Sequence, residues 1–454
     1  MPPIAPLLEL AARELDKGQT VPLPLQGTSF TLDSSGVAGF FGGDGAVQGM
    51  ATVHLFESRR WFGWYNTPGS YEIAKQYGQL ANSRFWDGLF PGVNRDPAQL
   101  FGLDGKPGPR FLAAHSGSVI QRSSHLAHLI ALKAQRTSRS TPVRNSRRAT
   151  LDCTVTTIDL DHIPELEMRA PRRKSRLPLF ALIPILSSIA ACIACALVAD
   201  WWCCASIAFG VLASGMACFV IGSGHLTFRH PKPANGAPPG DGILLDDEGI
   251  VVLRGQEGAV AAVTRGRFCL RYDGEPRYSS IGVASVGLTI QFLLQLLFIP
   301  QGTLFGQVMF VASLGISWLY NAYLSALDKE DIQTEVLMDV LKLRESDIQK
   351  FAFGTRTSQV VFTALSLRST RPMKLLDELL PNDTPVWRRW KKVLEPKLRA
   401  CEPLRFTESD WKVPHLTAED QILLQGLLID AEEAYEGWYA ATQTRPPSSI
   451  SKEK

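Results

Sequence analysis

The sequence predicts an α-helical integral membrane protein with four transmembrane helices arranged as two hairpins. Residues 177–224 contain a single charged side chain, Asp200, and residues 278–327 contain none. About 20 apolar residues cross a hydrocarbon core of about 30 Å, so each stretch is long enough for two crossings. In addition, lysine and arginine residues gather in the segments that flank these stretches, as is typical of multi-pass membrane proteins.

Each stretch divides at a turn. The four helices are expected at residues 177–199, 201–222, 281–299 and 303–325. Asp200 is expected in the first turn, because a charge at the centre of a membrane helix costs about 2.5–3.5 kcal/mol. Pro300, Gln301 and Gly302 form the second turn. The alternative is four buried helices of a soluble protein, in which such long uncharged runs are uncommon.

Basic residues decide the expected orientation. Five of them lie between 169 and 176, directly before the first helix, and seven more lie in the loop 225–277, whereas the two turns hold none. The positive-inside rule therefore predicts that both termini and this loop are cytosolic. Helices of this length fit both the endoplasmic reticulum and the plasma membrane.

The segments outside the membrane are expected to be a mixture of α and β structure. They are a cytosolic α+β N-terminal region (1–133), a flexible basic and acidic linker (134–176), a cytosolic loop with a small β unit (225–277), a cytosolic helical region (328–444) and a disordered tail (445–454). The linker is predicted from residues 133–148, which are rich in basic and hydroxyl side chains and contain no acid, so they bury little apolar surface.

Two sets of membrane residues indicate close contacts. Small residues recur every four positions in the first hairpin, at Gly210, Ser214, Cys218 and Gly222. Such a stripe lets helix backbones approach closely, either within the hairpin or between two copies in a homo-oligomer. Polar residues lie in the second hairpin, at Gln291, Gln295, Ser317 and Asn321. Because polar groups in lipid must find partners, these are expected to form hydrogen bonds between helices or to line a polar path.

Basic and hydroxyl residues outside the helices suggest two further roles. Anionic lipid headgroups are expected to contact basic residues beside the first helix and in a basic amphipathic helix at 385–400, namely Arg172, Arg173, Lys174, Arg176, Arg388 and Arg389. Phosphorylation is expected at Thr141, which precedes a proline, and at Thr150, which follows two arginines.

The sequence does not indicate an enzyme. His125 and His128 share a helical face but lack a third metal ligand nearby, and no nucleophile–base pair or paired carboxylates stand out, so neither a metal nor a cofactor is expected. The 47 basic and 44 acidic residues nearly cancel, which gives no indication of a nucleic-acid partner.

Three short segments, 218–224, 230–233 and 238–242, resemble uncharacterised multi-pass membrane proteins of mushroom-forming fungi. The resemblance implies the same membrane architecture and no particular activity. The sequence as a whole favours a membrane-anchored interaction or scaffold protein, whose cytosolic regions bind protein partners or lipid. The alternative is a subunit of a channel or transporter, with the polar residues of the second hairpin along its path.

Overall fold

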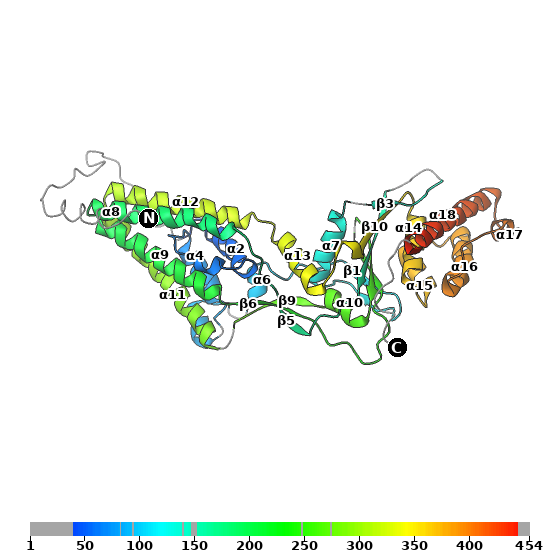
Figure 1. Cartoon of the computed structure of the whole chain (residues 1–454), viewed down its shortest axis with the longest axis horizontal. Coiled ribbons are helices and arrows are strands. Elements are labelled where there is room, and N and C mark those ends of the chain that lie inside the picture. Colours follow the sequence, from blue (N-terminus) through cyan, green and yellow to red (C-terminus); the bar gives the residue numbers. More distant parts are fainter. Residues whose placement is uncertain are drawn as a thin grey trace. The chain divides into compact units, whose positions relative to one another are not determined.

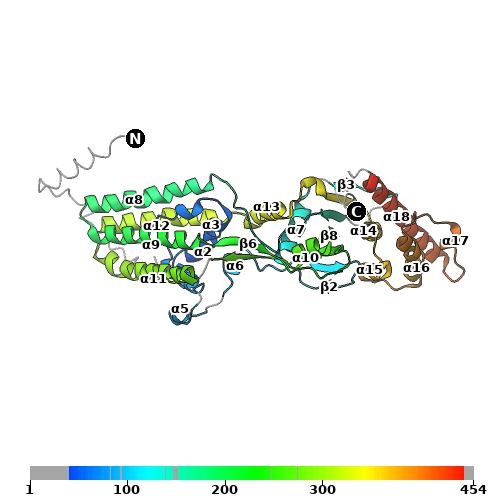
Figure 2. The same ribbon diagram turned by 60° about the horizontal axis from the view of Figure 1, so that its bottom comes forward.

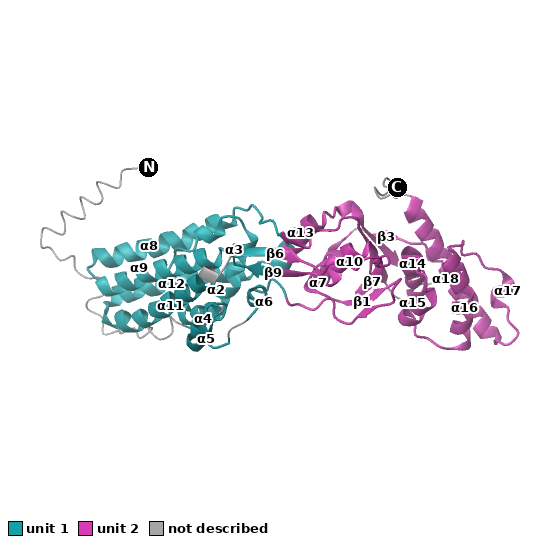
Figure 3. Ribbon diagram, turned by 90° about the horizontal axis from the view of Figure 1, so that it is seen from below, with its two compact units in different colours: residues 1–104, 169–227, 269–332 teal, residues 105–168, 228–268, 333–454 magenta. Residues whose placement is uncertain are grey.

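The structure is a computed structural model that describes residues 40–443 apart from 82, 93–94, 139, 147–151, 247 and 273–274. The chain forms two compact units, each assembled from three separate stretches (Figure 3). Unit 1 contains residues 1–104, 169–227 and 269–332, and unit 2 contains residues 105–168, 228–268 and 333–454.

Unit 1 contains the expected apolar helices. They are α8 (Leu182–Leu197, preceded by a 3-10 turn), α9 (Trp201–Ile221), α11 (Glu275–Phe298) and α12 (Leu304–Ser325). All four are long and apolar enough to cross a membrane. The prediction of four such helices is therefore confirmed. Helices α8 and α9 pack on each other as the first expected hairpin, whereas α11 packs on α9 and α12 packs on α8 (Figure 2).

Asp200 joins the turns of the two hairpins. It lies at the N-terminus of α9, as expected, and is buried with 3% of its surface exposed. Its carboxylate accepts hydrogen bonds from the backbone of Cys203 at 3.1 Å and from the backbone and hydroxyl of Thr303 at 2.7 Å each. Because the Thr303 hydroxyl also caps α12, one carboxylate fixes the starts of two helices.

Between residue 40 and the first apolar helix, the described part of unit 1 contains five short helices. They are α2 (Gly43–Met50), α3 (Thr52–Leu55), α4 (Ser70–Gly78), α5 (Arg84–Leu89) and α6 (Pro97–Leu100). Helix α2 packs on α12 and α4 packs on α11, and these two short helices also contact each other (Figure 1). The expected separate N-terminal region 1–133 is thus divided, because residues up to 104 belong with the apolar helices.

Unit 2 is built on a seven-stranded mixed sheet. Its strands are β1 (Arg110–Ala113), β2 (Val119–Ile120), β3 (Ser140–Pro142), β4 (Cys153–Leu160), β7 (Gly242–Asp246), β8 (Gly249–Gly255) and β10 (Ile348–Phe353). Their order is β2-β1-β7-β8-β4-β10-β3, with β4 parallel to β8 and antiparallel to β10. The sheet therefore brings together strands that lie far apart in the sequence.

Helices cover both faces of this sheet. Helices α7 (His125–Arg136) and α10 (Glu257–Thr264) pack on one face, and α14 (Arg356–Leu367) packs on the other (Figure 1). This explains why most of β4 is buried, since a strand covered on both faces has few positions open to solvent.

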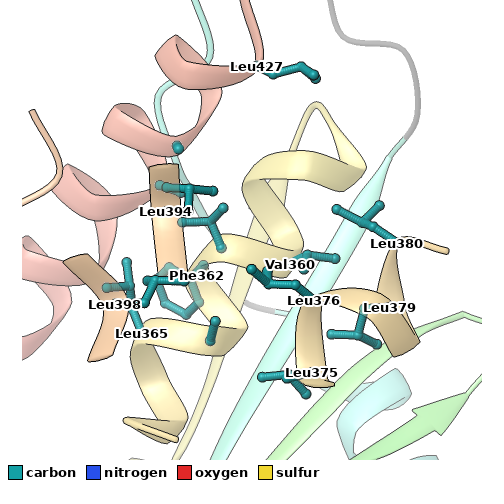
Figure 4. Close-up of a cluster of buried hydrophobic side chains, with 14 of the residues drawn as sticks. Val360, Phe362, Leu365, Leu375, Leu376, Leu379, Leu380, Leu394, Leu398 and Leu427 are labelled. Carbon is teal, nitrogen blue, oxygen red and sulfur yellow. The ribbon is translucent and has the colours of Figure 1, made fainter. Parts of the chain in front are cut away.

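Three further helices of unit 2, α15 (Pro372–Leu379), α16 (Pro385–Ala400) and α18 (Ala418–Gln443), form one apolar core with α14, in which their leucines meet Phe362 (Figure 4). The short helix α17 (Glu408–Trp411) packs on α18, and α13 (Lys329–Leu341) follows α12. Trp390 of α16 is fully buried in the apolar core, and its indole N–H donates to the Leu427 carbonyl at 3.0 Å. The tryptophan face of α16 is thus part of a protein core.

Two predicted regions differ from the structure. The expected flexible linker 134–176 contains β3 and the central strand β4, because the alternating threonine, valine and isoleucine residues of β4 follow directly after the basic stretch that suggested a linker. The expected small β unit in 225–277 contributes β7 and β8 to the large sheet, and part of it forms α10. A separate three-stranded sheet is formed by β5 (Glu167–Arg169), β6 (His225–Arg229) and β9 (Arg267–Arg271). The tail 445–454 lies outside the described residues.

Candidate functional site: a polar centre among the apolar helices

Residues 59–67 of unit 1, called the inserted segment below, lie among the four apolar helices. The backbone N–H of Asn66 donates to the Ser188 hydroxyl of α8 at 3.0 Å, and its side-chain amide donates to the Ser313 hydroxyl of α12 at 3.0 Å. The next residue, Thr67, accepts through its carbonyl from Gln291 of α11 at 3.4 Å. These hydrogen bonds connect the segment to α8, α12 and α11.

Asn321 of α12 also binds the inserted segment. Its amide N–H donates to the Thr67 hydroxyl at 3.2 Å, and its amide oxygen accepts from the Tyr65 hydroxyl at 2.8 Å. Asn321 and Gln291 were expected to bond to neighbouring helices or to line a path. In the structure both instead bind residues that come from the N-terminal part of the chain.

The small-residue stripe of α9 faces the same segment. A Cβ atom at Gly210 would lie 2.3 Å from the Asn66 side-chain oxygen, and one at Gly222 would lie 2.4 Å from the Arg60 Cβ atom. The Ser214 hydroxyl donates to the Gly63 carbonyl at 3.0 Å. Cys218 is buried against Gly63, where an added Cβ would come within 2.2 Å of it. The stripe is therefore occupied by the same chain, and a second copy would reach it only by displacing the segment.

Arg59 lies at the start of the inserted segment and is 1% exposed. Its guanidinium donates to the Phe62 carbonyl at 2.9 Å and to the Tyr65 hydroxyl at 3.5 Å, and it lies 5.5 Å above the ring of Tyr320. Among the described residues no carboxylate pairs with it. Carbonyl, hydroxyl and aromatic groups thus surround a buried cation, which ties the segment to α12.

Several buried polar atoms in unit 1 find no hydrogen-bond partner within the described residues. They include the amide oxygens of Asn66 and Gln291, both amide atoms of Gln295 and the hydroxyl of Ser317. An unsatisfied buried polar group costs about 1–3 kcal/mol, so these atoms are places where water or a ligand would be stabilised. Gln295 and Ser317 are thus buried as expected, but without the hydrogen bonds between helices that were expected.

His54 lies beside the polar centre, on α3. Its ring nitrogen Nδ1 is 3.3 Å from the Gly224 carbonyl, which follows α9, and its ring is 5.4 Å from that of Phe101. Burial and the nearby Arg172 guanidinium lower the pKa of His54 from 6.5 to about 3. The imidazole is therefore neutral at physiological pH and serves as a hydrogen-bond donor to the carbonyl.

The basic residues expected at lipid headgroups have varied surroundings. Arg172 is half-buried and donates to the carbonyls of Gly222 and Gly224, the last at 2.7 Å, which stabilises the C-terminus of α9. Arg173, Lys174 and Arg176 are exposed.

On α16, the two arginines expected at headgroups bind within unit 2. Arg388 pairs with Asp383 at 2.6 Å, and Arg389 donates to the Asp410 carbonyl at 3.4 Å. These interactions leave fewer free cations on this helix than the sequence suggests.

Unit 2 contains a separate cavity of about 870 Å³ between the end of α7, β3, β10 and α18. Its charged lining residues are Lys133, Arg136, Arg144, Glu345, Lys350 and Glu436. Lys133 pairs with Glu345 at 2.5 Å, and Glu436 pairs with Arg405 at 3.2 Å, so the acids are already neutralised. The cavity is therefore cationic. Thr141 also lines it and is exposed, whereas Thr150 lies outside the described residues.

The sequence interpretation missed Arg59, Asn66 and Thr67. The available signal was the run of aromatic and small residues from 61 to 70. Such a run is typical of close packing, but it does not indicate which part of the chain it packs against. Within the described ranges no group of three or more His, Cys, Asp or Glu side chains could hold a metal ion. No protein-family model, curated protein or solved structure matches the chain.

Proposed function

We propose that the protein is an integral membrane protein in which unit 1 crosses the bilayer four times and holds unit 2, a cytosolic binding unit, at the membrane surface. The observation that carries this proposal is the inserted segment, because it occupies the polar and small faces of α8, α9, α11 and α12. A bundle whose polar centre is filled by its own chain is suited to anchoring rather than to conducting solutes.

The outer surface of unit 1 supports its place in a bilayer. Large apolar side chains on α8 and α9 are more than half exposed, with Leu186 at 61%, Leu197 at 63% and Leu212 at 55%. Soluble monomers rarely expose apolar patches larger than a few hundred Å², whereas lipid tails cover such a surface without cost.

The cavity of unit 2 supports its role as the binding unit. Its volume of about 870 Å³ falls in the usual range of ligand pockets, about 300–1,000 Å³. Arg144 and Lys350 pair with no carboxylate in the described part of the chain, and Lys350 instead donates to the Gln135 carbonyl, so an acidic peptide or an anionic ligand is the expected occupant.

Membrane insertion and orientation can be tested with the one cysteine that is exposed in the described part of the chain, Cys401 of unit 2. A membrane-impermeant maleimide should label it in inverted vesicles and leave it unlabelled in sealed right-side-out vesicles, with Cys401→Ser as control. The protein should also resist extraction at alkaline pH. Labelling from the opposite side would refute the orientation, and extraction would refute the anchor.

Binding by unit 2 can be tested by affinity purification of the detergent-solubilised full chain after cross-linking in cells. The wild-type protein should retain partners that Arg144→Glu loses, while Lys392→Ala, an exposed lysine outside the cavity, should retain them. If wild type and Arg144→Glu capture the same proteins, the cavity is not the binding site.

A channel or transporter subunit is the second candidate, and the unsatisfied amides of Gln291 and Gln295 favour it, because such groups can hold water along a path. Proteoliposomes containing the purified protein should show no ion or water flux if unit 1 is an anchor. Flux that Gln295→Leu abolishes would reverse this order of candidates.

A further inference from the structure

Unit 1 carries an apolar groove of about 670 Å³ on its outer surface, between α4, α5 and α11. Helix α11 contributes one stripe of side chains to the groove, formed by Val283, Val286, Ile290 and Leu293. Helix α5 contributes the opposite wall, with Phe85 and Leu89, of which 69% and 52% are exposed. The groove is thus formed by two helices whose apolar side chains face each other.

Glycine residues hold α5 close to this groove. The indole ring of Trp86 lies so close to α11 that a Cβ atom at Gly282 would come within 2.3 Å of it. The ring of Phe90 approaches α4 in the same way, 2.2 Å from a Cβ placed on Gly78. These contacts make the groove a feature of packed elements rather than of a free surface helix.

The length of the groove matches one leaflet of a bilayer. Ten residues separate Val283 from Leu293, which at about 1.5 Å per residue gives about 15 Å. The hydrocarbon core is about 30 Å thick, so the stripe covers about half of it. The stripe lies around the middle of the apolar part of α11, Tyr278–Gln301, so the groove lies within the hydrocarbon core if this helix crosses the bilayer.

A lone cation lines this groove. Lys75 of α4 is exposed, and within the described residues no carboxylate pairs with it. Lys75 follows Tyr71 by one helical turn of α4. The Tyr71 ring lies 5.3 Å from the ring of Phe292, at the C-terminal end of the α11 stripe. A cation beside apolar walls in a membrane extends toward the interface and needs an anion there.

We propose that this groove binds an anionic phospholipid, with one acyl chain along the α11 stripe and the phosphate at the amino group of Lys75. The proposal rests on the proposed insertion of unit 1 in a bilayer. This proposal goes beyond membrane insertion because it specifies one lipid-binding site and the charge of the lipid headgroup, whereas a membrane anchor requires only a general apolar surface.

The test uses the full-length protein in proteoliposomes that contain phosphatidylserine or phosphatidylcholine with a photoreactive diazirine in one acyl chain. Label should concentrate in peptides that cover residues 84–91 and 283–293. Phosphatidylserine should label them about fivefold more than phosphatidylcholine, the preference expected of one basic side chain near an anionic headgroup. Lys75→Ala should remove this preference, and Lys392→Ala should keep it.

A groove-filling variant provides the second arm. Ile290→Trp should reduce the label on both peptides at least tenfold, whereas Gly287→Ala on the same helix should not, because its new Cβ meets no neighbouring atom. If Ile290→Trp does not fold, Leu89→Trp fills the groove from α5.

Three results would overturn the proposal. Equal labelling along the exposed faces of all four apolar helices would show general lipid contact only. Equal labelling by the two lipids would show that the groove does not select an anionic headgroup. Cross-links between two copies through the groove peptides would identify a second chain as the occupant. Extraction of the protein at alkaline pH would instead refute the membrane anchor itself, so the two failures are distinguishable.

Discussion

Replacing Gly210 by alanine tests whether the inserted segment really lies between the apolar helices. The added Cβ atom would stand 2.3 Å from the Asn66 side-chain oxygen and 3.2 Å from its Cγ atom. Ordinary contacts require at least 3.4 Å, so the Asn66 side chain must move by about 1 Å or more. The hydrogen bond from its amide N–H to the Ser313 hydroxyl is 3.0 Å long and would then exceed the range of a useful hydrogen bond, whereas the bond to Ser188 comes from the Asn66 backbone and does not depend on the side chain.

The magnitude follows from these contacts. The buried amide N–H of Asn66 left without a partner costs about 1–3 kcal/mol, while the Ser313 hydroxyl keeps its own hydrogen bond to the Phe310 carbonyl. Alanine in place of glycine inside a helix stabilises the helix by about 1 kcal/mol. The expected net loss in the free energy of unfolding is therefore about 0–2 kcal/mol.

The matched control is Gly315→Ala on α12, where the new Cβ meets no neighbouring atom. This control should be unchanged or more stable by up to about 1 kcal/mol. Unfolding of both full-length variants in mixed detergent micelles, followed by near-ultraviolet circular dichroism, should separate them by at least about 1 kcal/mol. Equal stabilities would show that Asn66 is not held against α9 and would refute the arrangement of the inserted segment.

Three further predictions concern other parts of the molecule. Asp200→Ala removes an acceptor of three hydrogen bonds and should lower the free energy of unfolding of unit 1 by about 3 kcal/mol in the same assay. The double variant Asp200→Ala, Thr303→Val should be only slightly less stable than Asp200→Ala, because the two side chains are hydrogen-bonded to each other. The pKa of His54 is about 3 in the folded protein and 6.5 in the unfolded chain, so below pH 6.5 the unfolded chain binds one more proton than the folded protein. The free energy of unfolding of unit 1 should therefore fall by about 2 kcal/mol between pH 7 and pH 5. His54→Gln should show no such dependence on pH, and a wild-type profile as flat as that of the variant would contradict the burial of the imidazole. Trp390→Phe should destabilise unit 2 by about 1–3 kcal/mol in urea unfolding, since it leaves the Leu427 carbonyl without its donor, while Trp387→Phe, only partly buried, should cost less.

The four apolar helices could be predicted because hydropathy is a local property. A run of about 20 uncharged residues identifies a helix whatever surrounds it, and Asp200 marked the turn by its charge alone. The same local reading showed that the face of Gly210 and Ser214 must meet something at close range. The sequence could not show which part of the chain packs on this face, because a stripe of small residues can accommodate any backbone, either of a neighbouring helix or of residues 59–67.

The sheet of unit 2 could not be predicted for a related reason. Strand β1 pairs with β7, and β4 pairs with β10, over separations of more than a hundred residues, and both pairs span apolar helices that belong to unit 1. Composition also misled the prediction locally. The basic residues before 148 suggested a linker for the whole of 134–176, although β4 within it has the alternating β-branched residues of a strand.

The interleaving of the two units has a consequence for biosynthesis. Strand β10 lies between β4 and β3, so until residues 348–353 leave the ribosome both of those strands present open edges, which are prone to wrong pairing. The inserted segment likewise emerges before any of the four helices that receive it. Unit 1 therefore remains incomplete until α12 leaves the ribosome and unit 2 until β10 does, and nascent chains stalled before α12 should remain protease-sensitive and depend on chaperones in both units.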